Sequence, residues 1–232
     1  KKTKILHSFH FLLIVNCLVM SFSTQPSILF PSLQSFFDEA KNNFNQIPAE
    51  RKKALSEISD YISQKKKLAK DIELTFICTH NSRRSHISQI MAQAAAAYNG
   101  AGNIYCYSGG TEVTAFNINA VNALRNIGFE IVATNTSNNP VYEVQYGSLT
   151  PKLIAFSKVY TSLPNPQKEY GAVLTCSQAD ASCPIVQGAD GRFKLPYEDP
   201  KLADGTPQQD NVYAERCKQI GLEMLYLFSQ VK

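Results

Sequence analysis

Apolar residues recur at every third or fourth position in two segments of the first third of the chain. Residues 32–46 and residues 49–70 both show this spacing, which is typical of helices that bury one face. Pro48 separates the two runs and stands where a second helix can begin. The pattern predicts an N-terminal extension, residues 24–70, made of a linker and a helical hairpin packed against the rest of the chain.

From residue 71 the pattern changes to short apolar runs that alternate with helical spacing. The predicted strands are residues 72–77, 103–107, 129–133, 141–146, 153–160, 172–176 and 193–196, and the predicted helices are residues 85–98, 115–126 and 208–231. Residues 141–146 and 153–160 alternate like an antiparallel pair. The alternation of strands and helices predicts an α/β domain over residues 71–232, with a parallel sheet covered on both faces.

Residues 1–23 have the pattern of a targeting segment. Lysines at positions 1, 2 and 4 precede an apolar run over residues 9–22, and small residues lie at its end. The run is shorter than the roughly 20 apolar residues of a membrane-spanning helix. We therefore predict an export signal and a periplasmic or secreted protein, with a cytoplasmic or membrane-anchored protein as the alternative. Membrane contact is expected only through this segment.

Composition narrows the range of partners. The net charge of +4 suits small anions, and no nucleic-acid recognition motif accompanies it, so no nucleic-acid partner is predicted. None of the six cysteines forms a pair at zinc-site spacing, so neither a metal site nor a cofactor is predicted. Cys106 and Cys217 stand at apolar positions of a predicted strand and helix, which indicates core residues.

The strongest chemical signal is the octapeptide CTHNSRRS at residues 78–85. It follows a predicted strand and precedes a predicted helix, where an open α/β sheet binds its ligand. Free N–H groups and the positive dipole at a helix start suit an oxyanion. The residues expected to bind the oxyanion are Thr79, His80, Asn81, Ser82, Arg83 and Arg84.

Three side chains of this loop are assigned chemical roles. The planar guanidinium of Arg84 can hold two oxygens of an anion. Cys78, as a thiolate favoured by the same positive field, can attack phosphorus or arsenic. Ser85 can donate a hydrogen bond to that thiolate. His86, in the first turn of the predicted helix, is interpreted as a surface residue.

The loop, together with YSGGTE at residues 107–112 and Asp199-Pro200, resembles the low-molecular-weight protein tyrosine phosphatase superfamily. The resemblance extends from about residue 72 to the end of the chain. It implies a three-layer α/β domain with a four-stranded parallel sheet, the flavodoxin-like phosphatase fold. It also implies that Asp199 is the general acid that protonates the leaving group, with Glu198 as the competing carboxylate.

The superfamily has two main branches, and the distal cysteines bear on the choice between them. Cys176 and Cys183 are similar to the redox pair of thioredoxin-coupled arsenate reductases. The resemblance implies a relay in which Cys78 attacks arsenate, Cys176 attacks Cys78, and Cys183 passes the disulfide to a thioredoxin-like dithiol donor. The aromatic residues that usually follow Asp-Pro in the tyrosine phosphatases are missing here. Arsenate reductase is therefore the preferred hypothesis.

Two alternatives stay open. A phosphomonoesterase that works through a cysteinyl-phosphate needs only Cys78, Arg84 and Asp199, and in an oxidising compartment the distal cysteines could form a structural disulfide. A non-catalytic oxyanion-binding module is the third hypothesis. His80 and Arg83 motivate it, because the family normally has glycine at the first position and often cysteine or a small apolar residue at the second.

Overall fold

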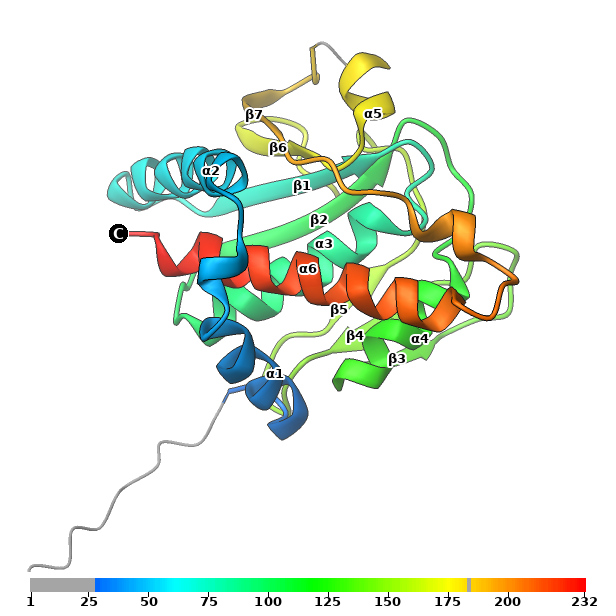
Figure 1. Cartoon of the computed structure of the whole chain (residues 1–232). Helices are drawn as coiled ribbons and strands as arrows, with labels where there is room; N and C mark the ends of the chain where they lie inside the picture. The colour runs from blue at the N-terminus through cyan, green and yellow to red at the C-terminus, as the bar shows by residue number, and fades with distance from the viewer. Residues whose placement is uncertain (1–27, 183–184) are drawn as a thin grey trace, which may run out of the picture.

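The computed structural model describes residues 28–182 and 185–232. The elements, in chain order, are α1 (Pro31–Lys41), η1 (Phe44–Gln46), α2 (Ala49–Lys67), β1 (Ile72–Cys78), α3 (Arg84–Tyr98), β2 (Ile104–Gly110), α4 (Ile118–Ile127), β3 (Glu130–Ala133), β4 (Tyr142–Gln145), β5 (Leu153–Ala155), β6 (Tyr170–Leu174), α5 (Ser177–Ser182), β7 (Ala189–Lys194), η2 (Pro200–Ala203) and α6 (Gln209–Ser229) (Figure 1). The predicted targeting segment and Cys183 lie outside the described residues. None of the described helices is long and apolar enough to span a membrane.

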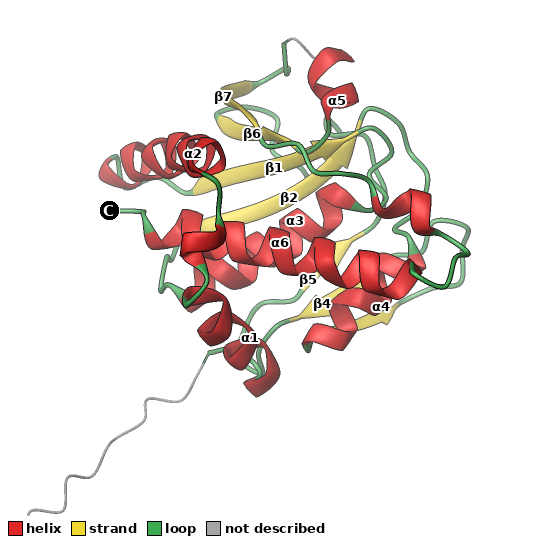
Figure 2. Ribbon diagram, viewed as in Figure 1, coloured by secondary structure: helices red, strands yellow, loops and turns green. Residues whose placement is uncertain are grey.

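The centre of the domain is a four-stranded sheet with the order β2-β1-β6-β7 (Figure 2). Its neighbouring strands all pair in parallel. Every residue of β1 except Glu73 is buried, as expected for a central strand of a covered parallel sheet. The prediction of an α/β fold with a four-stranded parallel sheet is confirmed.

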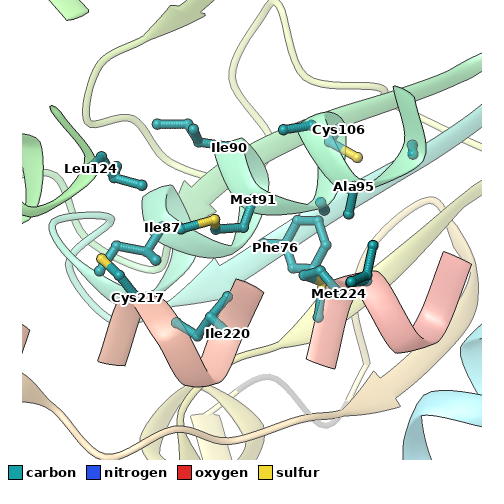
Figure 3. Close-up of a cluster of buried hydrophobic side chains, with 14 of the residues drawn as sticks. Phe76, Ile87, Ile90, Met91, Ala95, Cys106, Leu124, Cys217, Ile220 and Met224 are labelled. Carbon is teal, nitrogen blue, oxygen red and sulfur yellow. The ribbon is translucent and has the colours of Figure 1, made fainter. Parts of the chain in front are cut away.

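The two faces of this sheet are covered by different elements. Phe76 of β1 points into the larger apolar core, where it lies near Met91 and Ala95 of α3 and Met224 of α6 (Figure 3). Ile77, on the alternate face of the strand, belongs to a smaller cluster with residues of β6 and α5. Cys78, at the end of β1, also lies in this smaller cluster.

The N-terminal extension shares the larger core. Leu33 and Phe37 of α1, and Leu55 and Ile58 of α2, are buried in the same cluster as α3 and α6. Burial of each such side chain contributes roughly 1.5–3 kcal/mol. The two predicted helices are confirmed, but the predicted hairpin is wrong. Both helices pack mainly against α6, because η1 and Pro48 turn the chain between them.

Strands β3, β4 and β5 form a separate antiparallel sheet. The predicted antiparallel pair is confirmed in β4 and β5. Strand β3 follows α4 as predicted, but it joins this second sheet and not the parallel one. The reason is its exposure: Ile131 is the one buried residue of β3, and Val132 is 62% exposed. A strand of a covered parallel sheet is buried on both faces.

Candidate active site

Residues 79–83 connect the end of β1 to the start of α3 and lie against the end of β2. The approach is close enough to require glycine at position 110. A Cβ atom there would lie 2.6 Å from the carbonyl oxygen of Thr79 and 2.7 Å from the backbone nitrogen of Asn81. Any side chain at this position would therefore push the loop away from β2.

The loop is held in place through its carbonyl oxygens. The carbonyls of Thr79, His80 and Ser82 accept hydrogen bonds from Glu112 N, Ser157 Oγ and Asn117 N, at 2.8, 3.0 and 2.9 Å. Within residues 28–182 and 185–232, no hydrogen bond is donated by the backbone N–H groups of residues 79–83. These groups remain available as donors to an oxyanion at the start of α3.

A chain of buried polar side chains reaches the thiol of Cys78. Its Sγ lies 3.1 Å from Ser85 Oγ, which accepts a hydrogen bond of 2.9 Å from Asn81 Nδ2. Asn81 Oδ1 accepts from the backbone N–H of Lys158 at 2.9 Å. Because Ser85 Oγ accepts from Asn81, its own proton is free to point toward the sulfur. Asn81 thus fixes the orientation of the hydroxyl that can stabilise a thiolate.

We expect Asn81→Ala to slow reactions of the Cys78 thiol by about 10- to 100-fold, because a nucleophile held in the wrong orientation reacts slowly. Asn81 also has a left-handed backbone with a φ of 43°, so Ala adds strain. Asn81→Gly is the matched control, since it adopts this φ freely but lacks the amide. The measured rates of these reactions should show the same loss in both variants. A near-normal rate in Asn81→Gly would show that only the backbone matters.

Arg84 and Asp199 face each other across the site. Arg84 is 8% exposed; its Nη2 donates to Asp199 Oδ2 at 2.7 Å, and its Nη1 donates to the carbonyl of Tyr197 at 3.3 Å. The other oxygen of Asp199 caps η2 by accepting from Lys201 N. Glu198, by contrast, is exposed. The structure therefore brings Asp199, and not the competing Glu198, to the arginine of the loop.

Arg83 is directed away from this pair. Its Nε donates to Tyr213 Oη and its Nη2 to Asp204 Oδ2, both at 2.6 Å. Burial opposes ionisation of Asp204, but hydrogen bonds from Tyr213 and Arg83 outweigh it and hold the pKa of Asp204 below its ordinary value. The Arg83 side chain thus ties the loop to the segment after Asp199. Direct contact of this side chain with an oxyanion stays a prediction.

His80 and His86 lie in opposite environments. His80 is on the rim, with a side chain that is 46% exposed and an Nε2 atom 3.4 Å from Glu112 Oε2. His86 is fully buried, and its Nδ1 lies 2.8 Å from Ser108 Oγ. The prediction of a surface position for His86 is wrong, because the first turn of α3 is covered on all sides by neighbouring elements.

The environment of His86 keeps it uncharged. Burial, and then the positive charge of Lys158, lower the pKa of His86 well below its ordinary value. Burial also lowers the pKa of Lys158, to about 8. A neutral imidazole beneath the loop supports Ser108 and Asn81 as a hydrogen-bonding group and adds no charge to the site.

The described distal cysteine lies next to the loop. Cys176 is buried, and its Sγ is 3.5 Å from Thr79 Oγ1 and accepts from the backbone N–H of Ala179 at 3.3 Å. Its predicted partner Cys183 lies outside the described residues, so their pairing stays a prediction. Cys106 and Cys217 are buried in the larger core as expected, and burial raises the pKa of Cys217 to about 12.

A groove of about 610 Å³ lies elsewhere, between α1, η1 and α6. Glu223 and Gln219 are among its lining residues, but no residue of the loop is. The groove therefore does not coincide with the site that contains Cys78, Arg84 and Asp199. The thiol, the arginine and the acid are brought together by the loop and the η2 segment.

Sequence reasoning missed the residues that support the site from a distance. Ser157 and Lys158 hold the loop from the segment after β5, and Arg51 of α2 contacts the segment before Asp199. None of them belongs to a local motif. Arg51 was visible in the sequence, but the basic residues around it are interleaved with acidic ones, which is the pattern of an exposed helix face.

The fold and the loop define a class: an α/β protein with a cysteine and an arginine at the two ends of a turn between a strand and a helix. Neither a protein-family model nor a curated protein matches the sequence. The chain resembles several solved structures in fold. They include a YwlE mutant from Bacillus subtilis (14% identity, TM-score 0.47, 68% of this chain and 97% of that one) and a low-molecular-weight protein tyrosine phosphatase from T. tengcongensis (17%, 0.46, 68% and 98%). Another is the YwlE arginine phosphatase from Geobacillus stearothermophilus (13%, 0.46, 68% and 91%).

Proposed function

We propose that the protein is a cysteine-dependent phosphomonoesterase. The observation that carries the proposal is the Arg84–Asp199 pair, 2.7 Å long, which brings a carboxyl group to the same loop as the Cys78 thiol. Nucleophile, anion-holding arginine and acid are the three groups that hydrolysis through a cysteinyl-phosphate needs. All three lie among the described residues and converge on one loop.

In the first step, the Cys78 thiolate attacks the phosphorus of the bound monoester. An S–P bond forms and the P–O bond to the leaving group breaks. The carboxyl group of Asp199 gives its proton to the departing oxygen, so that an alcohol leaves. The guanidinium of Arg84 and the N–H groups of the loop stabilise the charge on the phosphoryl oxygens.

In the second step, water attacks the cysteinyl-phosphate. Asp199, now a carboxylate, accepts a proton from the water as the new P–O bond forms. The S–P bond breaks, phosphate is released and the thiolate of Cys78 is restored. Ser85 Oγ, 3.1 Å from the sulfur, can stabilise the thiolate as it leaves by donating a hydrogen bond.

Arsenate reduction is the second candidate, and the position of Cys176 supports it, since its sulfur lies beside the loop at 3.5 Å from Thr79 Oγ1. Cys78 would displace water from arsenate and form an S–As bond. Cys176 would then attack the Cys78 sulfur, the S–As electron pair would stay on arsenic, and arsenite would leave a Cys78–Cys176 disulfide. Cys183 and a thioredoxin-like dithiol donor would reduce it.

The substitution Cys176→Ser separates the two functions. For a phosphomonoesterase we expect hydrolysis of p-nitrophenyl phosphate to change less than about threefold, because Cys176 takes no part in the two steps. Arsenate turnover with thioredoxin and its reductase is the parallel measurement. Cys217→Ser, a fully buried cysteine on α6, is the matched control for placing a hydroxyl in an apolar site. Arsenate reduction that disappears only in Cys176→Ser would assign the protein to the reductase function instead.

A further inference from the structure

Helix α2 of the N-terminal extension contacts the segment that precedes Asp199. Arg51 of α2 donates from Nη1 to the carbonyl of Pro196 at 3.0 Å and from Nε to Glu223 Oε1 at 3.2 Å, and its Nη2 also pairs with Glu223. Tyr197 Oη donates to Glu223 Oε2 at 2.8 Å. Figure 1 shows the segment from β7 to η2 running above α6. Glu223 belongs to α6. One arginine of the extension thus holds both α6 and residues 196–197.

The side chains of Arg51, Glu223 and Tyr197 form one cluster that is largely buried, and each contacts the other two. The side chain of Arg51 is 17% exposed and that of Glu223 is 3% exposed. The guanidinium of Arg51 also lies over the ring of Tyr197, 4.8 Å from its centre. Burial, and then the charge of Glu223, raise the pKa of Tyr197 well above its ordinary value, so its hydroxyl remains a donor. Such a buried charge pair gives a defined geometry, which is lost when one partner is removed.

The same short segment contacts the catalytic arginine. The carbonyl of Tyr197 accepts from Arg84 Nη1, and Asp199, two residues later, accepts from Arg84 Nη2. Residues 196–199 are therefore held by Arg51 on one side and by Arg84 on the other. When a substrate oxyanion takes over Arg84, this end of the segment keeps its contacts with Arg51 and Glu223 and the backbone hydrogen bond of 3.0 Å from Tyr197 N to the carbonyl of Thr175.

We propose that Arg51 is a positioning residue that sets the location of the general acid Asp199 through Pro196 and Tyr197. This proposal rests on the proposed phosphomonoesterase function. The chain that follows Asp199 has a separate contact, because Arg83 pairs with Asp204. Loss of Arg51 should therefore displace Asp199 without dismantling the loop that holds Cys78. The helical extension would then be part of the catalytic machinery through this one side chain.

The test compares two substrates that differ in their need for an acid. p-Nitrophenyl phosphate has a leaving group that departs well unprotonated, whereas phenyl phosphate has a more basic one. Arg51→Met keeps the length of the side chain and removes its hydrogen bonds. We expect kcat to fall about threefold for p-nitrophenyl phosphate and at least about 30-fold for phenyl phosphate, within the range of general acid catalysis. KM should change little, since Arg84 and the loop remain.

A double-mutant cycle distinguishes positioning from general damage. In an Asp199→Asn background the acid is already lost, so Arg51→Met should add no further discrimination between the two esters. Lys53→Met is the matched control: it removes an exposed charge from the same helix and should leave both rates unchanged. For folding, Arg51→Met with Glu223→Met removes both buried charges together and should retain the fold while showing the same discrimination.

Two results would overturn the proposal. Equal losses on both esters in Arg51→Met and in the double substitution would mean that Arg51 acts on stability alone. Unchanged rates on both esters would mean that the acid is positioned without it. Failure of the proposed function looks different, because hydrolysis would then survive Cys78→Ser in the otherwise unchanged protein, and the inference about Arg51 would fall with it.

Discussion

Replacing Cys78 by serine is expected to lower kcat/KM for p-nitrophenyl phosphate by at least about 10⁴-fold, the scale of loss when a covalent nucleophile is removed. The reason is chemical, since a serine hydroxyl loses its proton far less readily than a thiol and is therefore a much weaker nucleophile. The hydroxyl that lies 3.1 Å from the sulfur of Cys78 is that of Ser85, which already accepts a hydrogen bond from Asn81. Binding of phosphate should persist, because the loop N–H groups and Arg84 are unchanged.

The measurement is steady-state hydrolysis together with trapping of the intermediate. Wild-type protein quenched in acid during turnover of a radiolabelled monoester should carry covalent phosphate, and Cys78→Ser should carry none. Cys217→Ser provides the control, because this cysteine is buried in the larger core and should keep full activity. Turnover of Cys78→Ser within tenfold of wild type would remove the cysteinyl-phosphate mechanism.

The second large effect is expected at Asp199. Asp199→Asn keeps the shape of the side chain and its contact with Arg84. Its amide, however, is too weak an acid to protonate the leaving group. For phenyl phosphate we expect kcat to fall by about 10²- to 10³-fold, and for p-nitrophenyl phosphate by much less, because only the more basic leaving group requires protonation.

Glu198 supplies the control for this prediction. It is exposed and adjacent in sequence, so Glu198→Gln makes the same chemical change one residue away. It should leave both rates within about twofold of wild type, as is usual for exposed positions. If Glu198→Gln gave the leaving-group dependence expected of Asp199→Asn, the assignment of the acid would be reversed.

Local patterns were sufficient for most of the backbone. The strand at residues 72–77, the loop at residues 78–85 and the helix that follows are encoded within one short stretch, where apolar continuity, polar loop residues and helical spacing succeed one another. The end of the helix predicted at residues 115–126 was close to the end of α4 at Ile127, but its start was not: the Asn117 side chain accepts from Asn119 N and Ala120 N, and α4 begins at Ile118. Strand β3 shows the limit of local patterns. They predict a strand at this position, but the sheet that the strand joins depends on which sheet can bury it.

The sequence by itself determined the α/β class and the presence of a loop with Cys78 and Arg84 between a strand and a helix. The resemblance to a known motif predicted Asp199 as the acid. Only the tertiary structure decided which side chains meet. Arg84 pairs with Asp199 across 115 residues and Arg51 with Glu223 across 172, and it is packing of the elements that buries His86 and directs Arg83 to Asp204. Periodicity records whether a position is buried on average, whereas a contact between distant residues exists only after helices and strands have packed in three dimensions.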